Sequence, residues 1–292
     1  MDTSSSGASG PTGRPQSPGL QLNNDLVHRM LVQFIRDESG NAGFRRAVVG
    51  VSGGVDSAVS VMLAAEALGK ENVLGLLMPY ATSSAVSAAD AGGLLGKIGV
   101  KAETIDISPV VDAFLRRDAA ADIVDRVRKG NLMARARMIA LFDVSARDGA
   151  IVLGTSNKTE ILLGYGTLFG DTACGINPIG DLYKTQVWDL ARHLDVPGAI
   201  IEKKPTADLW EGQTDEEELG FSYALADRLL FHMVDERRDD AQLGELGFEK
   251  HLIEKVRTRM RLNQFKRRPP LVAKISNRTV NVDFRYPRDW GI

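Results

Sequence analysis

Eight consecutive residues carry the strongest chemical signal in this sequence. An apolar run at 46–51 leads into a turn rich in glycine and serine, and a helical pattern follows. Glycine lets the backbone turn sharply and approach a ligand, and a helix N-terminus adds N–H donors and partial positive charge. Asp56 would repel a phosphate unless it holds a divalent cation that the phosphate shares, so we interpret it as a Mg²⁺ ligand. The segment predicts a phosphate-binding loop made of Gly50, Val51, Ser52, Gly53, Gly54, Val55, Asp56 and Ser57.

The same segment fits other patterns, which have to be weighed against this interpretation. It satisfies GxSxG, in which Ser52 would be the nucleophile of a hydrolase, but no HGGG-like segment and no earlier strand precede it. The chain has no GxxxxGK[ST] motif, and Gly164-Tyr165-Gly166 misses the dinucleotide pattern because Phe169 replaces the third glycine. An ordinary glycine-rich turn between a strand and a helix remains the plainest alternative.

Composition excludes several classes of protein. The 292 residues include 36 Lys+Arg and 38 Asp+Glu, for a formal charge of −2, so no net positive charge would recruit nucleic acid or anionic membrane. A single cysteine, Cys174, excludes an intramolecular disulfide framework. No apolar run approaches the ~18 residues of a membrane span. We therefore expect a soluble cytoplasmic protein that binds neither membrane nor nucleic acid.

The elements that must position the loop alternate between strands and helices. Short apolar runs predict strands at 46–51, 73–78 and 150–153, and a further strand is predicted at 101–107. Periodic patterns predict helices from Leu22, at 58–68, at 84–98, and at 121–146 with an interruption near Gly130. This order predicts an α/β fold with a doubly wound parallel sheet covered by helices on both faces. Ligands of such sheets bind beyond the carboxyl ends of the strands.

The two ends of the chain differ from this α/β part. Residues 1–19 are mostly Ser, Gly, Pro and Thr, which predicts a disordered tail before one domain at 20–292. Helices dominate from Lys184 onward, and one is expected to start at Thr214 with Glu217 completing a capping box. The acidic run 215–218 suits that helix start better than a metal site. Segments 81–87 and 205–213 are candidate lids over the loop.

Taken together, several motifs identify a family. SGGVDS resembles the pyrophosphate loop of the N-type ATP pyrophosphatases, whose fold is Rossmann-like and of the adenine-nucleotide α-hydrolase type. The later segments are similar, in the same order, to segments of the NAD synthetase family. This resemblance covers about residues 22–280. These segments are GNLMARARM from Gly130, GTSNKTE from Gly154, GD at 170–171, DLYKTQV from Asp181, PTADLW from Pro205, QTDE from Gln213 and KRRP from Lys266.

The resemblance implies an activity and a set of site residues. NAD synthetases use ATP and ammonia to convert deamido-NAD to NAD through an acyl-adenylate, releasing AMP and pyrophosphate. By position, Asp56 and Glu160 match the Mg²⁺ ligands and, with Lys184, the catalytic set. The ATP positions outside the loop are Thr155, Lys184 and Thr206, and the deamido-NAD positions are Arg135, Leu168, Gly175, Phe265 and Lys266. Leu168 and Gly175 replace the lysine and aspartate that ammonia-dependent members usually carry.

The resemblance also raises the questions of nitrogen source and assembly. Only a short tail precedes the synthetase motifs, so we expect free ammonia, or ammonia from a separate glutaminase, to be the nitrogen source. A homodimer is expected as in the family, and the apolar face within 122–142 (Ile123, Val127, Leu132, Ile139 and Phe142) suits an interface or core packing. Another amide-forming ATP pyrophosphatase, acting for example on xanthosine monophosphate, and a nucleotide-binding subunit without turnover are the alternative functions.

Overall fold

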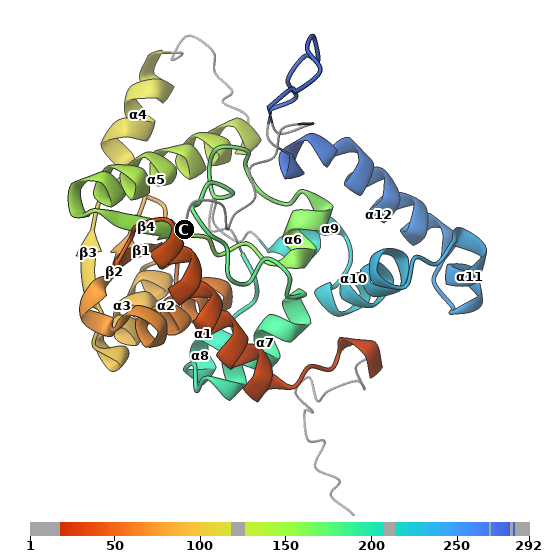
Figure 1. Ribbon diagram of the computed structural model, residues 1–292, viewed down its shortest axis with the longest axis horizontal. Coiled ribbons are helices and arrows are strands. Elements are labelled where there is room, and N and C mark those ends of the chain that lie inside the picture. The colour runs from red at the N-terminus through yellow and green to blue at the C-terminus, as the bar shows by residue number, and fades with distance from the viewer. Residues whose placement is uncertain (1–17, 118–125, 207–213, 269, 281–282, 284–292) are drawn as a thin grey trace, which may run out of the picture.

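A parallel β-sheet lies in one half of the computed structural model, which describes residues 18–117, 126–206, 214–268, 270–280 and 283 (Figure 1). Within these residues the sheet has four strands in the order β3-β2-β1-β4. Val48 of the central strand pairs with Leu74 on one side and Val152 on the other. The strands are β1 (Arg46–Gly50), β2 (Val73–Leu77), β3 (Lys101–Thr104) and β4 (Ala150–Leu153).

Both faces of this sheet are buried, as its apolar strands require. Val48, Leu76 and Val152 pack against the long helix α5, whereas Val49 and Leu153 face the opposite layer, which contains α2. Because both faces are covered, β1, β2 and β4 are mainly apolar, whereas the edge strand β3 is polar and mostly exposed. Figure 1 shows α5 and α4 on one side of the sheet, and α2, α3 and α1 on the other.

Twelve α-helices are assigned within the described residues. Their bounds are α1 (Asn24–Asn41), α2 (Val55–Leu68), α3 (Ala85–Ile98), α4 (Ser108–Arg117), α5 (Arg126–Asp148), α6 (Lys158–Leu163), α7 (Lys184–His193), α8 (Gly198–Ile201), α9 (Asp215–Leu219), α10 (Tyr223–Leu230), α11 (Asp240–Glu245) and α12 (Lys250–Leu262). Shorter helical turns are η1 (Pro18–Leu20), η2 (Lys70–Asn72), η3 (Phe231–Asp235) and η4 (Gln264–Arg267). None of these helices has the length and apolarity needed to cross a bilayer.

The predicted fold class is confirmed, and the strand order shows where a ligand belongs. From β1 the chain adds β2 and β3 on one side and β4 on the other. The direction of winding therefore reverses between β1 and β4. At such a switch point the loops at the carboxyl ends of the strands diverge and leave a crevice. The loop after Gly50 and the segment after Leu153 border that crevice.

Several local predictions about helices differ from the structure. Helix α5 continues through Gly130, which is buried, so the predicted interruption was wrong; tertiary packing outweighs the roughly 1 kcal/mol helix penalty of glycine. Helix α2 begins at Val55, three residues before the expected start. Helix α9 begins after Thr214 as expected, but the Thr214 side chain makes no capping hydrogen bond. The predicted capping box was therefore wrong as well.

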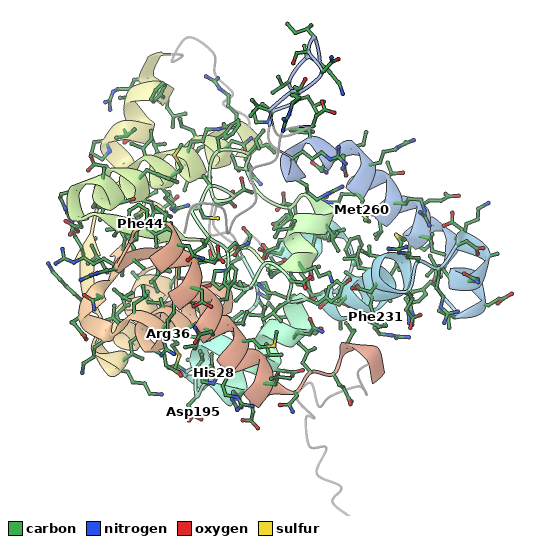
Figure 2. The ribbon with its side chains drawn as sticks, in the orientation of Figure 1. His28, Arg36, Phe44, Asp195, Phe231 and Met260 are labelled. Atoms are coloured by element: carbon green, nitrogen blue, oxygen red, sulfur yellow. The ribbon has the colours of Figure 1, made fainter. Side chains whose placement is uncertain are left out.

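The carboxyl-terminal helices enclose a second apolar core. It is built around Tyr183, Tyr223 and Leu229, with Phe231 and Met260 packed against it. Figure 2 shows these last two residues on the helical side of the molecule, far from Phe44, which packs with the sheet core. Trp188 of α7 contacts both cores, so α7 joins the sheet to the helical part.

The start of the described chain belongs to this second core. Leu20 is buried within it, and its carbonyl accepts a hydrogen bond from the Gln186 side chain at 3.1 Å. Of the predicted tail at 1–19, residues 1–17 lie outside the described part, whereas Pro18 and Gly19 belong to the helical turn η1.

Candidate active site

The loop between β1 and α2 is held in one shape by close backbone packing. Gly53 has φ +78°, and a Cβ there would stand 2.2 Å from the carbonyl oxygen of Ser87. Any other residue would therefore meet both backbone strain and a steric clash. Helix α2 begins at Val55 without a side-chain cap, so its first N–H groups are left for another acceptor. This arrangement is suited to an anion.

The two serines of the loop support its shape. Ser57 Oγ donates to the Gly54 carbonyl at 2.9 Å and accepts from the Ser52 N–H at 3.2 Å. Ser52 Oγ lies 3.2 Å from Ser57 Oγ and accepts from the Gly54 N–H at 3.3 Å. A hydrolase nucleophile would need a histidine here. All four histidines contact carboxylates elsewhere, namely those of Glu66, Asp25, Glu236 and Glu249. The geometry therefore disfavours the GxSxG alternative.

Two carboxylates and one lysine from three elements meet beside the loop. Asp56, in the first turn of α2, forms an ion pair with Lys184 at the start of α7. Glu160 of α6 lies 3.6 Å from the same ammonium group, measured from Oε1 to Nζ. The Lys184 side chain is 3% exposed, and those of Asp56 and Glu160 are 16% and 17% exposed. The three residues that the sequence assigned to catalysis are thus brought together.

Asn157 orders this cluster. Its Nδ2 donates to Asp56 Oδ1 at 2.9 Å. It also caps α6 in a reciprocal box, in which Glu160 N–H donates to Asn157 Oδ1 at 3.0 Å and Glu160 Oε2 accepts from the Asn157 N–H at 3.2 Å. A capping box satisfies two backbone donors at once and fixes the Glu160 side chain. Sequence reasoning missed Asn157, although the pattern Asn-Lys-Thr-Glu is a visible sign of such a cap.

The electrostatics of the cluster follow from burial and from the crowding of like charges. Burial opposes the charge on Lys184, but the carboxylates of Asp56 and Glu160 outweigh it and raise the pKa of the ammonium group. Burial and the Asp56 carboxylate together raise the pKa of Glu160 to about 8, against the attraction of Lys184. One lysine cannot neutralise two buried carboxylates, so this site favours additional positive charge.

Further polar and aromatic side chains lie next to the cluster of Asp56, Glu160 and Lys184. Asp215 accepts hydrogen bonds from the hydroxyl groups of Tyr165 at 2.9 Å and Tyr223 at 3.1 Å. The Lys184 ammonium lies 5.2 Å from the centre of the Tyr223 ring and 6.0 Å from that of Trp188. The acidic run at 215–218 thus does more than start a helix, because its first member borders the buried lysine.

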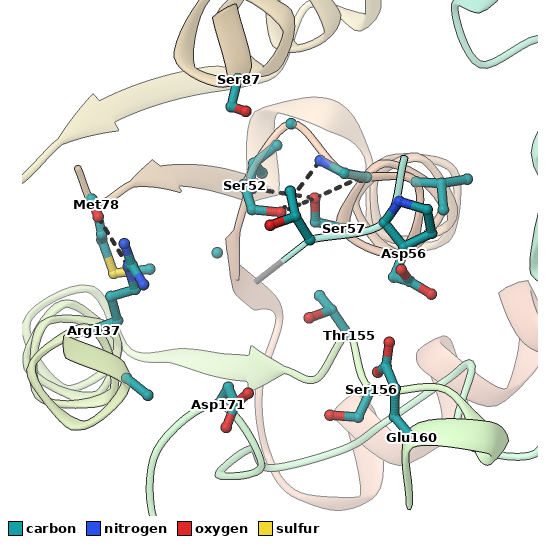
Figure 3. A pocket seen from close by; sticks show the side chains of 18 of the residues that line it. Ser52, Asp56, Ser57, Met78, Ser87, Arg137, Thr155, Ser156, Glu160 and Asp171 are labelled. Atoms are coloured by element: carbon teal, nitrogen blue, oxygen red, sulfur yellow. Dashed lines mark hydrogen bonds between the residues drawn. The ribbon is translucent and has the colours of Figure 1, made fainter. Parts of the chain in front are cut away.

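A pocket opens in front of the cluster. Asp56, Thr155 and Glu160 lie near one another at one part of it, whereas Met78 and Arg137 lie across from them (Figure 3). Arg137 Nε donates to the Met78 carbonyl at 3.1 Å. Leu77, Met138 and Leu141 give the far part an apolar lining. A pocket that combines charged side chains with an apolar lining suits a nucleotide, whose phosphates and base have the same contrast.

The predicted binding residues divide into two groups. Thr155, Lys184, Thr206 and the whole loop 50–57 line the pocket. Five others are not among the described residues that line it: Arg135, Leu168, Gly175, Phe265 and Lys266.

Within this second group the individual surroundings differ. Arg135 and Phe265 are exposed, and Gly175 packs against Ile151, from whose side chain a Cβ would stand 2.6 Å away. The Lys266 ammonium donates to the carbonyls of Gly164 and Gly166, each at 2.8 Å.

Two further lining residues were missed by sequence reasoning. Arg137 follows the predicted Arg135 by two residues and, unlike it, faces the pocket (Figure 3). Lys203 follows α8 and contacts the loop at the Gly53 carbonyl. No local pattern marks either residue, because both depend on how distant elements pack.

The two predicted lid segments border the pocket in part. Ser83, Ser84 and Ser87 of the first segment line the pocket, as do Pro205 and Thr206 of the second. Residues 207–213 lie outside the described residues.

Comparison with known proteins agrees with this geometry. The family model described as NAD synthase matches residues 27–270. The NH(3)-dependent NAD(+) synthetase of Chlorobaculum parvum is 55% identical over 274 residues, covering 93% of this chain and 97% of the relative. The enzyme of the same name from Fusobacterium nucleatum is 48% identical over 256 residues, covering 88% of this chain and 98% of the relative.

Solved structures agree as well. The NMN synthetase from Francisella tularensis is 32% identical, with a TM-score of 0.76 over 87% of this chain and 99% of its own. The NH3-dependent NAD synthetase from Campylobacter jejuni is 33% identical, with a TM-score of 0.73 over 87% of this chain and 100% of its own. These similarities agree with the glycine-rich loop and with the buried lysine between two carboxylates. The chain belongs to the NAD synthase family.

Proposed function

We propose that this protein uses ATP and ammonia to convert deamido-NAD to NAD, with release of AMP and pyrophosphate. The observation that carries the proposal is the meeting of Asp56, Glu160 and Lys184 beside the loop 50–57. The C. parvum relative, 55% identical over nearly its whole length, is an NH(3)-dependent NAD(+) synthetase.

The chemistry explains why the site needs these parts. A carboxylate is a poor electrophile, so its oxygen first attacks the α-phosphorus of ATP while the bond to pyrophosphate breaks. Ammonia then attacks the carbonyl carbon of the acyl-adenylate; AMP departs and a proton is lost from nitrogen. The loop N–H groups and the Lys184 ammonium would stabilise charge on the departing pyrophosphate.

Magnesium is the cofactor that this site fits. Asp56 and Glu160 offer the carboxylate oxygens that Mg²⁺ prefers, and both line the pocket. The described residues contain no group of three candidate protein ligands, which agrees with an ion that takes its remaining ligands from phosphates and water. Bound there, Mg²⁺ would supply positive charge to the phosphates.

Recognition of the dinucleotide is proposed to extend beyond the pocket. Arg135 and Ile139 are four residues apart on α5 and therefore share one helix face. Ile139 and Phe142 of that helix are 54% and 41% exposed. We propose that this face forms a homodimer interface. The substrate positions Arg135, Leu168, Gly175, Phe265 and Lys266 would then contact deamido-NAD next to it. Sedimentation of the wild type and of Ile139→Asp tests the dimer, and a monomeric wild type would disprove it.

A product assay tests the proposed reaction. Purified protein is incubated with ATP, Mg²⁺ and either ammonium or glutamine, with deamido-NAD, nicotinate mononucleotide or xanthosine monophosphate as acceptor. NAD and AMP formed in equal amounts with ammonium and deamido-NAD are the expected result. Product from one of the other acceptors alone would assign a different amidation. AMP formation that does not depend on any acceptor would contradict the proposal.

Two remaining expectations concern the cellular location and the binding of nucleic acid. We propose a cytoplasmic location, because the sequence carries a single cysteine, and no role for nucleic acid, because the formal charge is −2. Fractionation of cells and retention on immobilised nucleic acid test these two points.

A further inference from the structure

Lys203 connects three segments that border the phosphate loop. It follows α8, and its Nζ donates to the Gly53 carbonyl at 3.3 Å and to Ser87 Oγ at 3.5 Å. The same ammonium forms an ion pair with Asp90 of α3. The side chains of Lys203 and Asp90 are 21% and 19% exposed, so both are mostly shielded from solvent.

The contact between Lys203 and the Gly53 carbonyl lies where the loop has least freedom to move. Gly53 combines a positive φ with a close approach to the Ser87 backbone, which leaves no room for a side chain. Figure 3 shows Ser87 reaching from its helix toward the loop that carries Ser52. Lys203 therefore secures the outward-facing carbonyl at the point where the loop bends, and the N–H groups of the next residues begin α2.

The two lysines near the loop have different carboxylate partners. Lys184 lies on the far side of the loop with Asp56 and Glu160, whereas Lys203 has a carboxylate of its own in Asp90. A hydrogen bond from a charged donor to a carbonyl is stronger than one between neutral groups, and it is directional. The ion pair fixes the position of the ammonium, and the ammonium fixes the carbonyl.

We propose that Lys203 and Asp90 form a positioning pair that holds the loop 50–57 in the shape that binds the phosphates of ATP. Because it concerns the site of the proposed synthetase, this inference rests on the function proposed above. It predicts an effect on ATP and pyrophosphate that other substrates do not share. It also connects the segment that leads to Thr206 with the loop, since Lys203 precedes that residue by three positions.

The test compares Lys203→Met with the wild type in two measurements. In the steady-state assay, KM for ATP is expected to rise about tenfold, since one hydrogen bond from a charged group is lost. KM for deamido-NAD and for ammonium is expected to stay within about twofold. Binding of ATP without an acceptor, measured as the rise in Tm with nucleotide concentration, is expected to weaken by the same factor. This second measurement does not depend on which acceptor the enzyme uses, so it separates this proposal from the proposed function.

Lys97→Met is the matched control. Lys97 is an exposed lysine of α3 whose Nζ donates to another backbone carbonyl, that of Asp195, at 2.9 Å, and it does not line the pocket. The substitution removes the same charge and the same type of bond, so KM for ATP should remain at the wild-type value. Lys203→Arg keeps the charge and should recover most of the ATP affinity.

The pair is tested by a double-mutant cycle. Asp90→Asn should raise KM for ATP by about three- to fivefold, and Asp90→Asn added to Lys203→Met should cause little further loss, because both act on one contact. Multiplying effects in the double variant would mean that the two residues act independently. An unchanged KM for ATP in Lys203→Met, or equal changes in all three KM values together with a large loss of Tm, would overturn the proposal.

Discussion

The contacts of Asp56 allow the effect of the substitution Asp56→Asn to be predicted in most detail. Asp56 accepts from Asn157 Nδ2 at 2.9 Å through one oxygen and pairs with Lys184 through the other. An asparagine has only one oxygen. In either orientation of its amide, one N–H group faces another donor. Lys184, 3% exposed, would then keep only Glu160 as a carboxylate partner, at 3.6 Å.

The cost to stability can be worked out from this loss. Removing one partner of a buried ion pair typically destabilises a protein by about 3–5 kcal/mol. Glu160 remains as a partner and the Asp56 side chain is 16% exposed, so we expect the low end, about 3 kcal/mol, in the free energy of unfolding. For a chain of this size that corresponds to a fall in Tm of about 6 °C.

The cost to activity should be larger than the cost to folding. Losing one preorganised charged contact to the reacting phosphates typically lowers kcat by about 10²–10³-fold. The assay is NAD formation from deamido-NAD, ATP and ammonium, with circular dichroism to show that the variant is folded at the assay temperature. The loss should appear mainly in kcat, because the metal and the lysine act on charge that develops during adenylation.

Asp189→Asn provides the control for this prediction. Asp189 lies on α7, the helix that begins with Lys184, and its ion pair with Arg192 at 2.8 Å is exposed. Exposed pairs contribute at most about 1 kcal/mol, so this variant should keep its activity and nearly all of its Tm. Near-normal turnover in Asp56→Asn, with or without a change in Tm, would refute the assignment of this carboxylate to the metal and to Lys184.

Three further predictions concern neighbouring groups. Glu160→Gln should lower kcat for NAD formation by about 100-fold while leaving the circular dichroism spectrum unchanged; turnover within threefold of the wild type would count against its role. Burial raises the pKa of Asp227 to about 6, so the folded state binds this proton more tightly than the unfolded state. Stability from this group is therefore full below about pH 4 and is lost as pH rises through 6. Denaturant unfolding should show the wild type losing about 3 kcal/mol relative to Asp227→Asn across that range, and parallel pH curves would contradict the argument. Lys266→Met removes the ammonium that bridges the Gly164 and Gly166 carbonyls and should raise KM for deamido-NAD several-fold; a change confined to KM for ammonium would contradict it.

The sheet and the phosphate loop could be predicted from sequence because their signals are local. An apolar strand such as 150–153, and a loop such as 50–57 that joins a strand to a helix, carry their pattern within a few consecutive residues. The ends of strands were predicted less well: β3 stops at Thr104, whereas the predicted strand continued to Ile107. Hydrogen bonding to a neighbouring strand decides where a strand ends, and a single sequence does not contain that information.

Contacts made by tertiary packing could not be predicted in the same way. The charged residues Glu202 and Lys204 on either side of Lys203 give no sign that its ammonium reaches Gly53, 150 positions away. Gly130 misled because glycine is an unfavourable helix residue on average, whereas here a buried position within α5 tolerates it. The box predicted between Thr214 and Glu217 failed because the Thr214 side chain makes no capping hydrogen bond. The neighbouring acidic residues have tertiary partners: Asp215 accepts from two tyrosine hydroxyls, and Glu216 Oε1 accepts from the Tyr223 N–H at 2.8 Å.

The position of Trp188 gives this molecule an optical property. Its indole packs between the two apolar cores, edge-on to Tyr223 at 6.1 Å, and lies 6.0 Å from the Lys184 ammonium. Indole emission responds to nearby charge, so a ligand that draws this lysine toward phosphates alters the field at the ring. The chain also contains Trp210 and Trp290, so a variant that keeps Trp188 as its single tryptophan would let fluorescence follow occupancy of the pocket with no dye attached.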